Sequence, residues 1–75
     1  MAKLNLRQIL SENLRRYRQQ HGLAQDAFAT LCGVHRTYVG SVERCERNVT
    51  LGTLELLAKA TGVSVAQLLT KDGIP

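Results

Sequence analysis

The stretch that decides the fold lies at residues 25–42 and reads QDAFATLCGVHRTYVGSV. Two short helices joined by a tight turn need a small residue where they approach each other, and Ala29 supplies it. The turn needs a residue that tolerates positive φ, and Gly33 follows four positions later. Val39 and Val42, three residues apart, give the second helix a buried face and leave its opposite face free. The four positions together predict two helices at a tight turn, over about residues 25–32 and 36–44.

Three further helices are predicted by apolar residues at helical spacing and by cap residues. The first covers about residues 6–20, and Gly22 ends it with a left-handed cap. Another begins at the N-cap Thr50 and is closed by Gly62. The last opens at Ser64, because Ser-Val-Ala-Gln matches a capping box.

Length and composition indicate one domain, residues 1–75, since 75 residues leave no room for a second. Apolar residues make up 44% of the chain, which is too many for a disordered tail. With no Trp, one Phe and two Tyr, the core must rest on Leu, Val and Ala. No segment shows the alternation of a strand. The sequence therefore predicts an all-α fold, a compact orthogonal bundle of five short helices.

The net charge of +4 arises from ten Lys and Arg against six Asp and Glu. Residues 1–47 carry the whole excess, because residues 48–75 hold two basic and two acidic side chains. Such asymmetry suits a polyanionic partner, although a soluble basic surface would look the same.

The two cysteines, Cys32 and Cys45, are expected to be reduced, because no secretory signal precedes them. Cys32 and His35 have one spacing familiar from zinc sites, but no second pair follows at finger distance. Cys32 is therefore predicted to fill the core beside the turn, and neither a metal nor a cofactor is expected. No apolar run approaches the roughly 20 residues of a membrane span, so we expect a soluble, cytoplasmic protein.

These features resemble the Cro- and phage-repressor-like helix-turn-helix domains of the XRE family. The matching residues are Gly22-Leu23-Ala24-Gln25, Ala29, Gly33-Val34, Tyr38-Val39, Val42-Glu43-Arg44, Arg47-Asn48, and Leu54 through Gly62-Val63. The resemblance covers about residues 10–70, and the run from Arg36 to Val39 is similar to restriction–modification controller proteins. It implies a lambda-repressor-like DNA-binding domain that acts as a dimeric transcriptional regulator on double-stranded DNA, with the helix-turn-helix at about residues 25–44.

Two positions depart from the family pattern. Ala24 stands where Ser or Thr is usual, so the helix after it is expected to lack a side-chain N-cap, a loss of roughly 1 kcal/mol. Asp26 in its first turn is expected to compensate in part through the helix dipole. Cys45 stands where Gly or Asn commonly adopts a left-handed conformation, which places the geometry after Arg44 in question.

Given the resemblance, base contacts are expected from the exposed front of the second helix of the pair and the residue before it, at His35, Arg36, Thr37 and Ser41. Arg36 is the strongest candidate, because a guanidinium can bridge O6 and N7 of guanine, although it could instead meet a phosphate. Phosphate contacts are expected from Gln25, Tyr38, Arg44, Arg47 and Asn48. For Tyr38 the alternative is a ring that covers the core.

Two further sets of residues are expected to be structural. In the family, a basic residue at the position of Arg18 pairs with the acid at the position of Glu43, and this pair would orient the second helix. One recognition helix reads only a few base pairs, so a homodimer on an inverted repeat is expected. Its interface is predicted around Val65, Leu69 and Ile74.

Three competing functions differ in how well the sequence supports them. An enzyme is rejected, because no phosphate loop, carboxylate pair or nucleophile–base set is present. A basic amphipathic helix for membranes is disfavoured, because the core needs its apolar stripe. An antitoxin-like or other protein-interaction role, with DNA binding secondary, stays open. No small-molecule effector is evident, and regulation of the protein's own operon is suggested by the controller-like resemblance.

Overall fold

The computed structural model describes residues 5–75, and this part of the chain contains five helices and no strand. They are α1 (Leu6–Gln20), α2 (Gln25–Cys32), α3 (Arg36–Glu43), α4 (Leu51–Thr61) and α5 (Val65–Leu68). The predicted all-α bundle is confirmed, and the predicted bounds of the first three helices agree to within one residue. Lys3, which the charge count includes, lies outside the described residues.

The cap residues account for most of the helix ends. The Thr50 side chain accepts a hydrogen bond from the N–H of Thr53 at 3.2 Å, and Gly62 closes α4 with a φ of 73°. Ser64 and Gln67 form the predicted capping box at the start of α5. Ala24 gives α2 no side-chain cap, as predicted. The caps at Thr50, Gly62 and Ser64 each provide a hydrogen bond for a backbone group at the end of a helix that would otherwise lack a partner.

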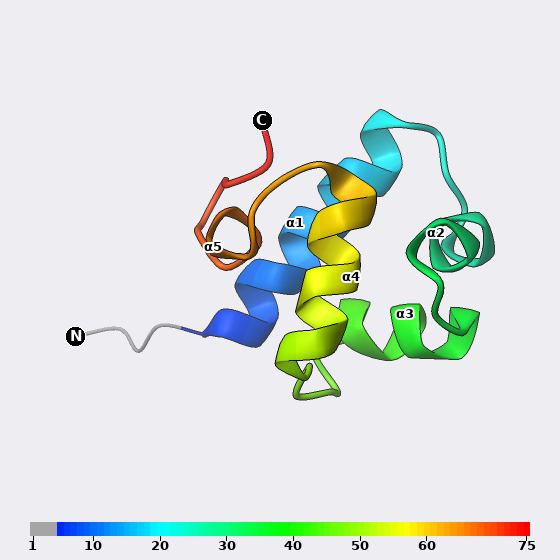
Figure 1. Cartoon of the computed structure of the whole chain (residues 1–75), viewed down its shortest axis with the longest axis horizontal. Coiled ribbons are helices and arrows are strands. Elements are labelled where there is room, and N and C mark those ends of the chain that lie inside the picture. Colours follow the sequence, from blue (N-terminus) through cyan, green and yellow to red (C-terminus); the bar gives the residue numbers. More distant parts are fainter. Residues whose placement is uncertain (1–4) are drawn as a thin grey trace.

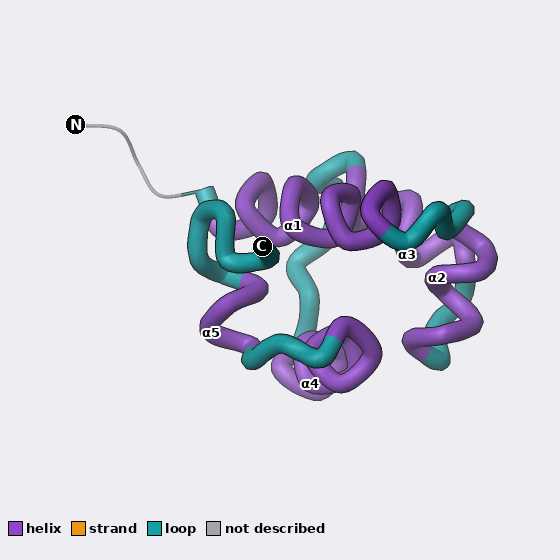
Figure 2. The backbone as a smooth tube through the Cα atoms, turned by 90° about the horizontal axis from the view of Figure 1, so that it is seen from above, coloured by secondary structure: helices purple, strands orange, loops and turns teal. Residues whose placement is uncertain are grey.

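The helices cross at steep angles, as expected of an orthogonal bundle. In Figure 1, α2 is seen nearly end-on while α3 lies lengthwise below it. In Figure 2, α4 is nearly end-on and faces the lengthwise α1 across the core. The helix α3 packs against α1 and α2, α4 packs against α2 and α5, and α5 packs against α1. No helix of residues 5–75 is long and apolar enough to cross a membrane.

The core lies where these crossings meet, and Phe28, which is fully buried, is its largest side chain. The other apolar members are Leu10, Leu14, Ala29, Cys32, Val39, Val42, Leu54, Leu57, Ala58, Leu68 and Ile74. The thiol of Cys32 fills this core beside the turn, as predicted, and burial raises its pKa to about 11. Within residues 5–75, no group of three or more His, Cys, Asp or Glu is placed to hold a metal ion.

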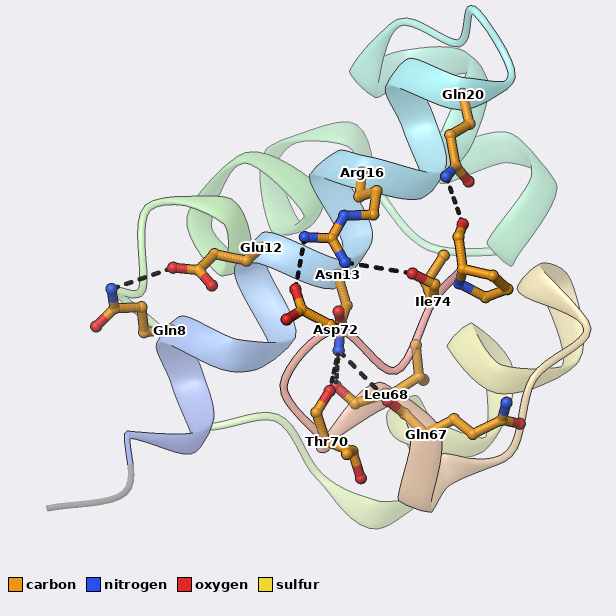
Figure 3. Close-up of polar contacts among 11 residues, drawn as sticks. Gln8, Glu12, Asn13, Arg16, Gln20, Gln67, Leu68, Thr70, Asp72 and Ile74 are labelled. Atoms are coloured by element: carbon orange, nitrogen blue, oxygen red, sulfur yellow. Dashed lines mark hydrogen bonds and ion pairs between the residues drawn. The ribbon is translucent and has the colours of Figure 1, made fainter.

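A C-terminal hook, residues 69–75, folds back onto α1 (Figure 3). The buried Asn13 donates hydrogen bonds from its amide nitrogen to the carbonyl oxygens of Leu68 at 2.8 Å and Thr70 at 2.9 Å. Arg16 reaches the same hook and pairs with Asp72 at 2.8 Å. The carbonyl of Leu68, which ends the four-residue helix α5, and that of Thr70 just after it therefore find their partner on α1.

The hook also requires a correction to the predicted dimer interface. Ile74 was predicted to contact a second copy, but its side chain is only 3% exposed and belongs to this chain's own core. The chain bends back at Gly73, where an added Cβ would lie only 1.8 Å from the carbonyl oxygen of Gln67. Val65 and Leu69 are half-buried against the core, so both stay predictions.

The segment after α3 closes at Cys45, which adopts a left-handed φ of 62°. Its N–H donates to the carbonyl of Val42 at 3.0 Å, and the N–H of Glu46 donates to that of Ser41 at 2.9 Å. This is the hydrogen-bond pattern of a Schellman motif, in which Gly normally takes the left-handed position. Cys45 therefore keeps the usual geometry of this helix end, at the cost of backbone strain from its Cβ.

We predict that Cys45→Gly stabilises the protein by about 1 kcal/mol, because glycine adopts this φ without the Cβ clash. For a chain of this size, such a gain raises Tm by about 4–8 °C. Cys45→Ala is the matched control, since it removes the thiol but keeps Cβ, and its Tm should change little. Equal gains in the two thermal melts would show that the thiol, and not the φ, carries the cost.

Candidate nucleic-acid interface

The helix α3 buries one side and exposes its N-terminal front. Val39 and Val42 lie in the core, as predicted, at 2% and 3% exposure. Arg36 and Thr37 are exposed in its first turn, and His35 precedes them as the N-cap. The first turn is thus available to a partner while the rest of the helix is held by α1 and α2.

The orientation of α3 is fixed by Glu43 at its C-terminal end. Arg18 of α1 donates from Nε to Oε2 of Glu43 at 2.7 Å and from Nη2 to Oε1 at 2.8 Å. The predicted structural pair is therefore present, and it is bidentate. The Glu43 side chain is 4% exposed, and its hydrogen bond with Arg18 raises the pKa of that guanidinium. The two side chains thus form a bidentate pair between α1 and the C-terminal end of α3.

Two more hydrogen bonds reach Glu43 from different helices. The amide nitrogen of Gln25, at the start of α2, donates to Oε1 of Glu43 at 3.0 Å. The buried hydroxyl of Ser11 in α1 donates to the backbone carbonyl of Glu43 at 2.6 Å. Arg18 also donates to the carbonyl of Leu23 at 3.1 Å, in the connection between α1 and α2. Glu43 therefore joins α1, α2 and α3 at one buried point.

A hollow of about 510 Å³ lies above this network, between the start of α2 and the exposed side of α3. Its lining residues are Arg18, Ala24, Gln25, Asp26, Arg36, Thr37, Gly40 and Arg44. Since Glu43 already pairs with Arg18, the charged side chains left to face the hollow are those of Arg36 and Arg44 against that of Asp26, and this excess of positive charge favours an anion. The Asp26 carboxylate accepts a hydrogen bond from the N–H of Ala27 at 2.9 Å, which ties it to the first turn of α2.

The four predicted base-contact residues are not equally accessible. His35, Arg36 and Thr37 are exposed and adjacent. Arg36 makes none of the ion pairs found among residues 5–75. Ser41 is only 8% exposed, and its hydroxyl donates to the carbonyl of Thr37 at 2.8 Å. Ser41 stays a prediction, but it must act through its remaining acceptor capacity.

The predicted phosphate contacts fall into three places. Gln25 and Arg44 line the hollow, and Arg44 also forms an exposed ion pair with Glu46 at 3.1 Å. Arg47 lies over the ring of Tyr38, with Cζ 5.2 Å from the centroid. Tyr38 is half-buried and packs against the core, so its ring takes the alternative role expected for it as well. Asn48 lies elsewhere, beside an apolar groove.

Sequence reasoning missed the part that Gly40 plays in the hollow. A Cβ built at Gly40 would lie 3.1 Å from Nη1 of Arg44 and 3.5 Å from Oε1 of Gln25. The bare backbone therefore leaves room for both side chains to cross this face of α3. A glycine inside a helix costs about 1 kcal/mol relative to alanine. A glycine inside a predicted helix, directly after the buried Val39, is the sequence signal that could have drawn attention to this position.

We predict that Arg18→Ala and Glu43→Ala each destabilise the fold by about 3 kcal/mol, because each leaves the other charge buried without its partner. The double variant should then lose clearly less than the two single losses added together. Thermal or urea unfolding of the four proteins measures this coupling.

The exposed pair of Arg16 and Asp72 provides the matched control in the same chain, since its side chains are 38% and 65% exposed. Its coupling should stay below about 1 kcal/mol. Additive losses for Arg18 and Glu43 would contradict the structural pair.

Comparisons with known proteins agree with this geometry. A family model described as Helix-turn-helix (HTH_3) matches residues 14–68. Control protein C.SmaI from Serratia marcescens is 54% identical over 71 residues, which cover 95% of this chain and 84% of that protein. The solved structure of the hypothetical transcription factor NHTF from Neisseria has a TM-score of 0.84 at 39% identity, and the match covers 96% of this chain and 87% of that one.

A second solved structure includes DNA. It is the restriction-modification controller protein C.Esp1396I, a tetramer in complex with its natural 35 base-pair operator. Its TM-score is 0.75 at 30% identity, and the match covers 88% of this chain and 87% of that one. The family consists of DNA-binding regulators and not of enzymes. The resemblance to XRE domains and controller proteins is confirmed: this chain belongs to the HTH_3, or XRE-type, family of helix-turn-helix proteins.

Proposed function

We propose that this protein is a sequence-specific transcriptional regulator that binds double-stranded DNA as a dimer and places α3 in the major groove. The observation that carries the proposal is the exposed first turn of α3, which stands beside a cationic hollow on a helix held in place by a buried ion pair. Major-groove recognition requires such a helix, fixed at its back and free at its front.

The hollow is the proposed site for the DNA backbone. Arg36 and Arg44 supply positive charge there, and Ala24 gives α2 no side-chain cap, so that within its first turn only the N–H of Ala27 has a side-chain acceptor, the Asp26 carboxylate. Free N–H groups at a helix N-terminus favour a phosphate oxygen. The amide of Gln25 already binds Glu43, so Gln25 serves best by its backbone and by the position of its side chain in the hollow.

We propose a separate surface for the dimer contact, an apolar groove between the first turns of α1, the start of α4 and the end of α5. Leu69 lines this groove of about 190 Å³, whose other residues are Leu6, Arg7, Leu10, Asn48, Val49 and Leu54. An apolar groove on a small protein is a suitable surface for a second copy. Half-sites about one helical turn apart, roughly 10 base pairs, would then face the two recognition helices.

The proposed output is regulation of transcription through the protein's own concentration, with no catalytic step. The C.Esp1396I relative binds its natural operator as a tetramer. Control of this chain's own operon follows the same logic, because dimerisation makes operator occupancy rise steeply with protein concentration. A DNA partner of this kind supports a location in the cytoplasm of a prokaryotic cell.

We predict that Arg36→Ala removes discrimination at one base pair of the operator by roughly 1–3 kcal/mol and leaves Tm almost unchanged, because Arg36 is exposed. Random-site selection followed by footprinting identifies the operator. Binding of the wild type and the variant to every single-base change of that operator then measures the effect. Arg36→Lys should recover affinity better than specificity, because an ammonium lacks the planar fork of a guanidinium.

Arg47→Ala is the matched control, since it removes one charge from an exposed side chain that lies over Tyr38. It should weaken operator and random DNA by similar factors and lower the slope of log K against log salt by about 0.9. A uniform loss for Arg36→Ala would make Arg36 a phosphate contact as well. Failure of the wild type to select any sequence would overturn the proposed function.

We also predict that the wild type sediments as a dimer, and that Leu69→Gln shifts the equilibrium toward monomer by placing a polar group in the apolar groove. Leu31→Gln is the control, because Leu31 is 52% exposed on α2 and lies outside the groove. Analytical ultracentrifugation with and without operator DNA provides the measurement. A monomeric wild type in both conditions would refute the dimer.

A further inference from the structure

His35 begins the recognition helix in an unusual way, because its imidazole ring is the N-cap. Its Nδ1 accepts a hydrogen bond from the N–H of Thr37 at 3.1 Å, and its backbone is extended, with φ −76° and ψ 143°. Ser, Thr, Asn and Asp are the usual N-cap residues, and their short side chains are engaged by the hydrogen bond to the first turn of the helix. The ring of His35 is exposed and carries a second nitrogen beyond the one that caps.

The cap determines which nitrogen carries the proton. A backbone N–H can only donate, so Nδ1 must present its lone pair to Thr37. A neutral imidazole has one donor and one acceptor nitrogen, and the proton therefore lies on Nε2. Nε2 is at the opposite edge of an exposed ring that directly precedes Arg36. The recognition helix thus begins with an oriented hydrogen-bond donor and no outward acceptor.

We propose that His35 is a specificity-determining residue, which uses the Thr37 hydrogen bond to fix its tautomer and reads a base acceptor in the major groove with Nε2–H. This inference rests on the proposed DNA-binding function. Guanine presents two acceptors, N7 and O6, whereas cytosine presents only an amino donor. His35 therefore favours guanine over cytosine on the strand it faces, since a donor opposite a donor leaves both without a partner.

The first test examines the tautomer in the free protein. Long-range proton–nitrogen NMR at a pH where the ring is neutral distinguishes a protonated nitrogen from one with a lone pair. The expected result for His35 is a protonated Nε2 and a bare Nδ1. A predominant Nδ1–H tautomer would overturn the proposal, because that form cannot accept the hydrogen bond from Thr37. His21 is an internal comparison, since its Nδ1 lies 2.9 Å from the carbonyl of Tyr17 and must donate.

The second test uses variants that separate the cap from the donor. His35→Asn keeps a cap oxygen and an outward N–H donor, whereas His35→Asp keeps the cap but offers only acceptors. His35→Ala removes both. All are measured against every single-base change of the selected operator, with Tm recorded to confirm folding.

The expected pattern is specific to one base pair. His35→Ala and His35→Asp should lower the preference for guanine there by about five- to tenfold, while His35→Asn retains part of it. His35→Asp should also gain relative affinity for cytosine, whose amino group can donate to a carboxylate. Equal losses at every operator position would overturn the role of His35 and leave the proposed function standing. A wild type without any sequence preference would overturn both.

Discussion

The carboxylate of Glu43 is the constraint on which the arrangement of the helices depends. It accepts two hydrogen bonds from Arg18 and one from Gln25, and the backbone carbonyl of the same residue accepts one from Ser11. These donors come from α1 and α2, whereas Glu43 ends α3. A buried carboxylate is tolerated only when its oxygens are satisfied, so the three helices are held in the one arrangement that satisfies it.

The ion pair of Arg18 and Glu43 contributes more to the orientation of α3 than to the stability of the fold. Removing two charges from water costs much of what their attraction returns, and a well-packed apolar pair could stabilise the bundle equally well. Directional hydrogen bonds, however, prevent α3 from rolling or sliding against the core as apolar contacts alone would allow. A recognition helix must present its first turn at a fixed angle, and the rigid network beneath α3 provides this. The exposed residues at its front can then differ in chemistry without disturbing the support.

Much of the fold could be predicted from local sequence. Helix ends were found because Thr50, Ser64 and Gly62 act through groups a few residues away, and such interactions are visible in the chain itself. The pair of Arg18 and Glu43 was found only through family resemblance, because spacing alone does not join residues that are 25 apart. The same resemblance predicted the controller-like function, and the exposed first turn of α3 is the structural feature that fits it.

Other features could not be read from the sequence, because their partners lie far along the chain. Asn13 falls on the same helical stripe as Leu10 and Leu14, which marks it as buried but does not identify the carbonyls 55 and 57 residues away. Ile74 follows a glycine in a segment without periodicity, so its place in the core had no local signal. The cap formed by His35 was missed because histidine is not among the usual N-cap residues.

The C-terminal hook has a consequence for how the protein is made. Asn13 is synthesised early, but the carbonyls of Leu68 and Thr70 that it binds follow 55 and 57 residues later. Closing a loop of this length costs conformational entropy before the stabilising contacts can form. Until the hook has folded back, this side of α1 therefore lacks the partners that cover it in the finished bundle. Completion of the fold therefore depends on the closure of this long loop, whereas each helix cap forms between residues only a few positions apart.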